Sequence, residues 1–375
     1  MTKFLKRVAL TSLSVLLLVT LSLGLSTAWW TPPSSAALPA GNAITDSKAL
    51  LRYSLPIDNQ AVRQLQASLE DIATQLRANR RWSAISGDLS KASLIVSDRT
   101  SQLLESVPEE RKPQAKALID DLKASITDVR TAVDAKDKEK IWLGRANLLN
   151  LVSQLEDCMV KGFPFEVPDE YSNLPQLKGR ATVEMKTNKG SITLVVDGYS
   201  APVTAGNFVD LVQRGFYNGL EFIRAEDSYV LQTGDPPGPD QGFIDPATGK
   251  YRAIPLEVLV KGDQVPTYGI TLEDAGRYRD QPVLPFSAYG AVAMARPEGA
   301  PNGGSSQFFF FLFEPELTPA GRNLLDGRYA VFGYLTEGKE VLDQLKAGDK
   351  IESAKVIQGA ENLVQPQVAL TSVFP

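Results

Sequence analysis

The 375-residue sequence contains no histidine and a single cysteine, Cys158. Without imidazole it cannot build a Ser-His-Asp or Cys-His catalytic centre, or a zinc site that uses histidine. One cysteine also excludes an intramolecular disulfide and a thiolate metal cluster, so we expect no metal and no cofactor. The formal net charge is −5 and no stretch is strongly basic, which disfavours nucleic acid as a partner. Any chemistry must come from arginine, carboxylates, amides and shape.

The N-terminal segment, residues 1–40, has the pattern of a secretory signal peptide followed by a spacer. Lys3, Lys6 and Arg7 precede the apolar run Val8–Leu25, and small residues with several possible cleavage points follow. Lys6-Arg7 is not a twin-arginine pair, so we expect Sec-type export out of the cytosol. A retained membrane anchor is the alternative, because about eighteen apolar residues are just long enough to span a bilayer.

Residues 41–162 are predicted to form a helical domain. From Asp58 to about Gly162 apolar side chains recur at spacings of three and four, which predicts amphipathic helices with charges on the opposite face. Four such stripes are present: Val62, Leu65, Leu69, Ile72, Leu76; Trp82, Ile85, Leu89; Leu118, Leu122, Ile126, Val129, Val133; and Ile141, Leu148, Val152, Leu155, Met159. Helices with short connections favour an antiparallel helical bundle. Cys158, beside the last stripe, is expected to be a plain buried thiol.

Residues 163–177 hold three prolines, Pro164, Pro168 and Pro175, and are predicted to form a linker. From residue 178 to 375 the apolar period becomes two, which predicts many strands and few helices, and hence a closed antiparallel β-barrel with capping helices. The expected strands are 181–185, 192–196, 220–223, 228–233, 290–295, 306–313, 329–335 and 351–358, and the expected helices are 202–214 and 338–346. The Pro- and Gly-rich stretch from Asp235 to Pro285 is predicted to be a long surface loop.

Four ordered fragments of this half carry a family signal: APVTAGNFVD (201–210), FIRAEDSYVLQTGD (222–235), GAVAMARPEGAPNGGSSQFFFF (290–311) and LDGRYAVFG (325–333). In this order and spacing they resemble the cyclophilins, which are peptidyl-prolyl cis–trans isomerases with an eight-stranded barrel. With its helical half and linker, the whole chain resembles the large thylakoid-lumen cyclophilins of plants and cyanobacteria. That type is linked to photosystem II assembly.

The resemblance implies a site. Arg224 matches the catalytic arginine of the family, and Gln232 matches the amide that holds the substrate carbonyl. The residues that match the substrate-binding wall and the neighbouring subsite are Tyr229, Val230, Met294, Ala295, Gln307, Phe309 and Leu325. By alternation along the strand from Phe309, we expect Phe308 and Phe310 to be buried inside the barrel instead.

The match is incomplete at the rim of this site. Ile223 and Tyr329 stand where family members usually carry histidine, and Leu324 stands where many eukaryotic members carry a tryptophan that supports cyclosporin binding. Val230 replaces a longer side chain, and Tyr229 replaces a phenylalanine. We therefore expect weak or no activity on short peptides and no tight cyclosporin binding.

Two functions fit these residues. The first is an isomerase acting on X–Pro bonds of exported, lumenal or membrane proteins, which assists folding and photosystem II assembly. The second is an assembly factor that grips proline-containing segments with little or no turnover and is gated by its helical domain. Expected partners are proline-containing segments of clients, including lumenal loops of photosystem II subunits, with membrane contact only through clients or an uncleaved N-terminal segment. The signal is compatible with the thylakoid lumen and with the periplasm.

Overall fold

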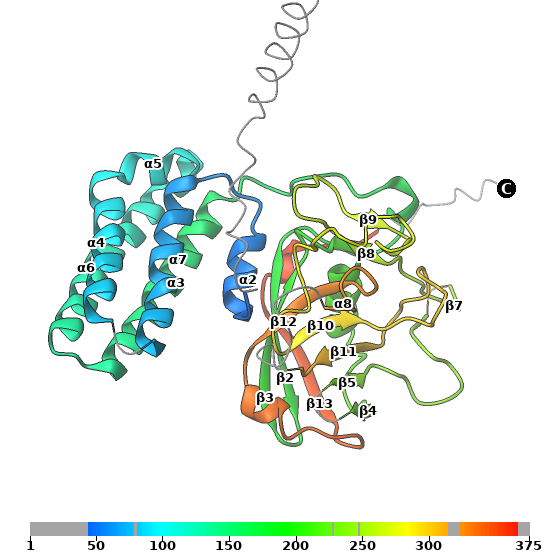
Figure 1. Cartoon of the computed structure of the whole chain (residues 1–375). Coiled ribbons are helices and arrows are strands. Elements are labelled where there is room, and N and C mark those ends of the chain that lie inside the picture. Colours follow the sequence, from blue (N-terminus) through cyan, green and yellow to red (C-terminus); the bar gives the residue numbers. More distant parts are fainter. Residues whose placement is uncertain (1–43, 79–80, 227–228, 247, 314–322, 367–375) are drawn as a thin grey trace, which may run out of the picture. The chain divides into compact units, whose positions relative to one another are not determined.

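The computed structural model describes residues 44–366 except 79–80, 227–228, 247 and 314–322 (Figure 1). The predicted export signal, residues 1–40, lies outside this part of the chain. Within the described ranges, no helix combines the length and the apolar character needed to cross a bilayer.

The helical half forms the predicted bundle. Its helices are α3 (Gln60–Arg77), α4 (Trp82–Asp98), α5 (Thr100–Glu105), α6 (Lys112–Asp134) and α7 (Lys138–Met159), with a 3₁₀ turn at Glu109–Arg111. Each long helix packs on two others, α3 on α4 and α7, and α6 on α4 and α7 (Figure 1). The predicted stripes supply the core, where Leu65, Leu69 and Leu89 are fully buried. Burying one such side chain stabilises the fold by about 1.5–3 kcal/mol.

Two of the bundle helices begin directly after a short polar residue that caps their first turn. Asn59 precedes α3, and its Oδ1 accepts a hydrogen bond from the Val62 backbone N at 3.0 Å. Asp137 precedes α7 and accepts in the same way from Lys140 N at 3.1 Å. Each cap satisfies one backbone N–H that would otherwise lack a partner within the helix.

An additional helix, α2 (Ser47–Ser54), precedes the bundle in the chain. Its Leu50 and Leu51 are buried against the outer face of the β-sheet rather than in the bundle core, and the helix lies beside β12 (Val331–Glu337) (Figure 1). The sequence predicts a bundle that includes this segment, and the structure places it on the sheet instead. An eight-residue helix is too short to show a periodic apolar stripe, and its packing partners lie far away in the sequence.

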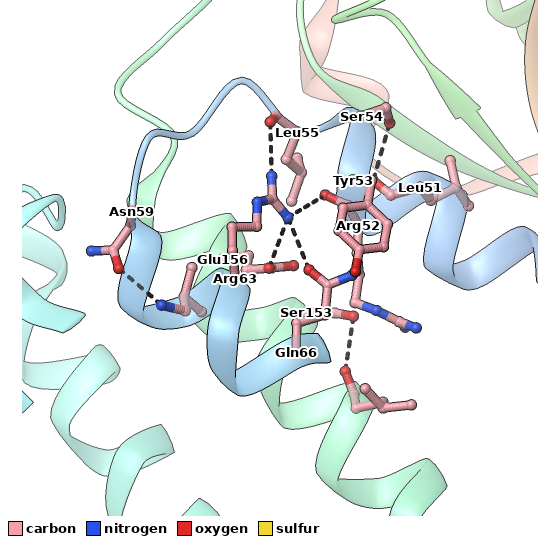
Figure 2. Close-up of polar contacts among 12 residues, drawn as sticks. Leu51, Arg52, Tyr53, Ser54, Leu55, Asn59, Arg63, Gln66, Ser153 and Glu156 are labelled. Carbon is pink, nitrogen blue, oxygen red and sulfur yellow. Dashed lines mark hydrogen bonds and ion pairs between the residues drawn. The ribbon is translucent and has the colours of Figure 1, made fainter. Parts of the chain in front are cut away.

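Polar contacts hold α2 on two sides. Towards the sheet, Ser54 Oγ donates to Asp197 Oδ2 at 2.9 Å, and the Arg180 guanidinium pairs with the same carboxylate at 2.7 Å. Towards the bundle, Arg63 of α3 donates to the backbone oxygens of Arg52 and Leu55 at 2.8 and 3.2 Å (Figure 2).

The same Arg63 guanidinium reaches α7. It donates to Glu156 at 2.9 Å and to Gln66 at 3.0 Å (Figure 2). The Glu156 side chain is fully buried, and its Oε2 has no hydrogen-bond partner. Burial raises the pKa of Glu156 to about 8, although the nearby arginines oppose that rise.

The second half is an eight-stranded antiparallel sheet in the order β13-β2-β3-β12-β10-β11-β5-β4. Its remaining strands are β2 (Arg180–Thr187), β3 (Gly190–Asp197), β4 (Phe222–Glu226), β5 (Val230–Thr233), β10 (Ala291–Met294), β11 (Phe308–Phe311) and β13 (Ile351–Gln358). The edge strands β4 and β13 meet at the bridge Glu221–Lys350, and Phe222 N donates to Asp349 O at 2.8 Å beside it. The sheet thereby curls into the predicted barrel.

In the described part of this half, two α-helices accompany the barrel, α8 (Pro202–Gln213) and α9 (Lys339–Leu342), and both lie within the predicted ranges. Alternation along β11 places Phe308 and Phe310 in the barrel core with Phe208 of α8, as predicted. Phe309 and Phe311 belong instead to the outer-face cluster. This alternation follows from the two-residue period of a strand, and it decides which side chains a substrate can reach.

The predicted linker and surface loop contain more structure than expected. The linker includes a 3₁₀ turn (Asp169–Tyr171) and strand β1 (Gln176–Leu177), which pairs with β14 (Leu363–Val364). The loop includes the ladders of β6 (Ile244–Asp245) with β7 (Lys250–Tyr251) and of β8 (Glu257–Val258) with β9 (Thr267–Tyr268). Strands of two residues are too short to show an alternating pattern in the sequence.

Glu257 shows what the loop does for the fold. Its Oε2 accepts hydrogen bonds from the backbone N atoms of Val203 and Thr204, at 3.1 and 2.9 Å, and so caps the start of α8. Burial raises the pKa of Glu257 to about 7, against the lowering effect of these hydrogen bonds.

Candidate functional site

Two rows of side chains cross the outer face of the barrel. We define the arginine row as Arg224, Gln232, Phe309, Ala293 and Val331, which stand directly opposite one another on β4, β5, β11, β10 and β12. The glutamate row, two residues further along β4, consists of Glu226, Val230, Phe311, Ala291 and Tyr334. Directly opposed residues in antiparallel strands point to the same face with Cβ atoms about 4.5–5.5 Å apart. Each row is therefore a line of neighbouring side chains.

The apolar part of these rows belongs to one packed cluster, which also contains Phe286, Leu325 and Tyr329. The Phe309 ring lies edge-on to Tyr329 with centroids 5.4 Å apart, and it stacks on Phe286 at 6.0 Å. This arrangement holds Phe309 in one orientation and makes an aromatic wall of the kind that a proline ring requires.

The polar end of the arginine row lies at the edge strand. Half of the Arg224 side chain is exposed (54%), and its Nε donates to Glu226 Oε1 at 2.9 Å, with Nη2 bonded to the same oxygen. Since a guanidinium stays charged at any working pH and carries five N–H donors, Arg224 can still donate to a substrate.

Gln232 is held by a relay of amides. Its Nε2 donates to Gln307 Oε1 at 2.7 Å, and Gln307 Nε2 donates to Asp235 Oδ1 at 2.7 Å and to the Gln241 carbonyl at 2.9 Å. Burial raises the pKa of Asp235, and the hydrogen bond from Gln307 opposes the rise. The relay leaves Gln232 Oε1 and one amide N–H available for a substrate.

Most residues implied by the resemblance come together on this face. Val230 and Phe309 are in the outer-face cluster, with Leu325 and Ala295 packed against it. Tyr229 lies edge-on to Phe311 at 5.8 Å, on the exposed rim.

Met294 corrects the expectation for the pocket wall. Its side chain packs in the barrel core, beside Gly304. A Cβ added at Gly304 would lie 3.1 Å from Met294 Cγ. Strand alternation is the reason, because Met294 follows Ala293 and therefore points to the opposite face. Ala293 is the β10 residue that stands in the arginine row.

Several residues of this face were not singled out in the sequence as site residues. Glu226 could have been found, because it follows Arg224 by two positions in a predicted strand. Phe286 and Asp235 carried no local signal. Arg296, whose guanidinium carbon lies 5.2 Å from the Tyr329 ring centroid, also became visible only in the structure.

The rim differs from the family pattern as expected from the sequence. Tyr329, at the position of a family histidine, packs against Phe309, while Ile223 is exposed. Leu324 is 85% exposed and is not part of the outer-face cluster. Over the described residues, no group of three or more Asp, Glu or Cys side chains is placed to hold a metal ion.

Comparison with known proteins agrees with this architecture in both halves. A family model described as the PsbQ-like domain of CYP38-like peptidyl-prolyl cis-trans isomerases matches residues 46–160. A second, described as cyclophilin type peptidyl-prolyl cis-trans isomerase, matches residues 182–365.

Three relatives align over most of the chain. A Synechocystis protein, named provisionally as a thylakoid lumen peptidyl-prolyl cis-trans isomerase, is 59% identical over 358 residues, which cover 94% of either chain. The chloroplastic isomerase CYP38 of Arabidopsis thaliana is 45% identical over 344 residues, 89% of this chain and 78% of that one. CYP37 of the same plant is 32% identical over 372 residues, 92% and 76% of the two chains. The chain therefore belongs to the cyclophilin-type peptidyl-prolyl cis–trans isomerases, in the group that joins a PsbQ-like helical domain to the cyclophilin domain.

Proposed function

We propose that this isomerase acts on X–Pro bonds of proteins in the thylakoid lumen, and that it assists the folding of lumenal loops during photosystem II assembly. The names of the relatives support the compartment, since they refer to the thylakoid lumen and the chloroplast. The PsbQ-like description of the helical half is consistent with photosystem II clients.

The observation that carries the proposal is the arginine row. Phe309 is the aromatic side chain of the row and is 5% exposed in the free protein. Gln232 stands directly opposite it, and Arg224 is the next side chain across the sheet. A proline seated on Phe309 therefore presents its peptide bond to an amide and a guanidinium at once.

The chemistry requires no nucleophile and no base. Rotation about a peptide bond is slow because amide resonance imposes a barrier of about 18–20 kcal/mol. In the twisted transition state the proline nitrogen regains a lone pair, which can accept a hydrogen bond that the planar ground state cannot. In this mechanism Arg224 donates that bond while Gln232 holds the carbonyl, so both groups bind the transition state more tightly than the substrate.

The second candidate is a binding factor that grips proline-containing segments without turning them over. Tyr329, Ile223 and Leu324 favour it, because all three alter the rim of the proline surface. The contact of α2 with the outer-face cluster supports gating by the helical half, since Leu50 and Leu51 belong to the same cluster as Phe309.

A protease-free isomerisation assay on the exported part of the chain separates the two functions. Exchange between cis and trans forms of a proline peptide is followed by NMR, and binding of the same peptide by calorimetry. Accelerated exchange supports the isomerase. Binding with an unchanged exchange rate would favour the binding factor.

A further inference from the structure

The catalytic guanidinium has a resident partner in the free protein. Glu226 Oε1 receives both Nε and Nη2 of Arg224, whereas the neighbouring amide of Gln232 is turned towards Gln307. A substrate that takes hydrogen bonds from Arg224 must therefore compete with a carboxylate of the same strand.

Glu226 is placed where it can also contact a side chain of the substrate. It begins the glutamate row and stands opposite Val230, two residues beyond Arg224 on the same face of β4. Two residues along a strand correspond to about 6.6 Å. A side chain one or two residues away from a proline seated on Phe309 can reach that distance, since an extended chain advances about 3.3–3.6 Å per residue.

The pair is exposed enough to exchange partners. The two side chains are 54% and 46% exposed, and an ion pair of this kind contributes little to stability in water. When Arg224 turns to the twisted amide, Glu226 loses its cation. A lysine or arginine of the substrate can replace that cation, whereas an acidic residue adds repulsion.

Two other charged side chains near the site, Asp235 and Arg296, have partners of their own. Asp235 accepts from Gln307, and Arg296 donates to the Arg328 carbonyl while it covers Tyr329 at the far end of the aromatic wall. Among the described residues, Glu226 is the charged side chain that is bonded to Arg224, and its partner changes when Arg224 turns to a substrate.

We propose that Glu226 is a specificity residue: it restrains Arg224 in the free protein and selects X–Pro segments that carry a lysine or arginine within two residues of the proline. This inference rests on the proposed isomerase function of Arg224 and names the substrate class of that site.

The test uses a series of peptides with one proline and a lysine, alanine or glutamate at each of the two positions on either side. Exchange by NMR and binding by calorimetry are measured at low salt with the wild-type chain and with Glu226→Gln. We expect the wild type to prefer the best lysine peptide over its glutamate counterpart by about tenfold. Glu226→Gln is expected to lose this preference and to act about two- to fivefold faster on the alanine peptide, the range of an exposed ion pair.

The control is Glu221→Gln, which removes the same charge from the neighbouring position before β4. Glu221 pairs with Lys350 at 3.2 Å and has a similar exposure, 53%. The control must keep the wild-type preference, and Glu226→Lys must reverse it. A reversal cannot come from a loss of folding, and thermal unfolding of each variant verifies that the fold is intact.

Two outcomes separate this inference from the proposed function. If wild type and Glu226→Gln isomerise all peptides at the same rate, the proposed selection by Glu226 is wrong, and the proposed isomerase function is supported. If none is isomerised but lysine peptides bind best and Glu226→Gln removes that preference, the selection stands while catalysis fails.

Discussion

At the scale of single residues, the proposed mechanism assigns catalysis to few groups of the arginine row. In the proposed mechanism Arg224 donates to the proline nitrogen, while Gln232, whose Nε2 already donates to Gln307, holds the substrate carbonyl. The place of Arg224 on the edge strand β4 leaves its side chain half exposed, so its removal should not disturb the packing of the barrel.

We expect Arg224→Ala to lower kcat/KM by at least tenfold, which corresponds to about 1.4 kcal/mol of transition-state stabilisation. Arg224→Lys should also be poor, because an ammonium lacks the planar fork of donors. The measurement is the NMR exchange assay, with the thermal midpoint as control. Unchanged activity in a folded Arg224→Ala protein would remove this residue from the mechanism.

A second residue-scale prediction concerns Leu324. The resemblance implies that tryptophan at this position supports cyclosporin binding, and Leu324 supplies neither an indole N–H nor a large flat contact. Leu324→Trp should therefore raise cyclosporin affinity relative to the parent, as measured by calorimetry. Because the side chain is 85% exposed, the substitution has room to be accommodated. Nanomolar binding by the unmodified chain would contradict the prediction.

At the scale of elements, α2 has contacts with both halves of the described chain. Its apolar side chains contact the outer-face cluster, and its backbone carbonyls accept from Arg63 of the bundle (Figure 2). The helix is short, so its stability must come from this packing and not from its own hydrogen bonds.

We expect Leu51→Ala to destabilise the chain by about 2–5 kcal/mol, the usual cost of emptying a buried leucine site. Urea unfolding measures the change. Leu94→Ala is the matched control, because Leu94 lies on α4 with 53% of its surface exposed, and it should change stability by less than about 0.5 kcal/mol. Equal effects of the two substitutions would show that α2 does not pack as described.

Buried Glu156 predicts how stability depends on pH. Its pKa is about 8 in the folded chain and close to 4.5 when unfolded, so the folded state binds more protons between these values. The free energy of unfolding should then fall as the pH rises from about 5 to 8, on the order of 3 kcal/mol in total. Glu257, with its pKa raised to about 7, adds to the same slope.

Urea unfolding at a series of pH values checks this dependence, with Glu156→Gln as the test variant. The amide keeps a hydrogen-bond acceptor for Arg63 but does not titrate. Glu156→Gln should therefore flatten the slope, and the part that remains comes from Glu257 and from other carboxyl groups whose pKa burial raises, such as Asp157. A wild-type stability that rises between pH 5 and 8 would contradict the assignment.

At the scale of the whole molecule, the helical half is expected to govern access to the proline site. The exposed rim residues Arg224 and Leu324 are accessible to solvent in the described structure, so any restriction must act through the apolar wall. Leu50 and Leu51 contact the cluster that contains this wall.

We predict that residues 175–375 bind a proline-containing lumenal loop peptide more tightly than residues 41–375 at the same salt. A site that is only partly open loses apparent affinity in proportion to its closed population. Calorimetry on both proteins, with circular dichroism as a check on folding, measures the difference. Equal affinities would rule out restriction by the helical half, and weaker binding by the barrel alone would mean that the helices contribute contacts.

The sequence by itself determined the division into a helical and a strand-rich half, the faces of the long helices and the burial of Phe308 and Phe310. These features depend on periodicity between residues that are close in the chain. The motif around Arg224 and Gln232 is equally local, and so the resemblance located it. Alternation counted from Phe309 along its own strand was reliable, whereas Met294 was assigned by resemblance alone and points into the core.

Only the tertiary structure decided where α2 packs, which partner Arg224 takes and why the pKa of Glu156 is raised. Arg63 and Glu156 are 93 positions apart in the chain, and Gln232 and Gln307 are 75 apart. No local pattern brings such residues together, because their meeting depends on how whole helices and strands pack. Burial of a glutamate has the same origin. The sequence of an amphipathic helix predicts that its glutamates are exposed. Only the packing of another element over Glu156 removes the water that would stabilise its charge.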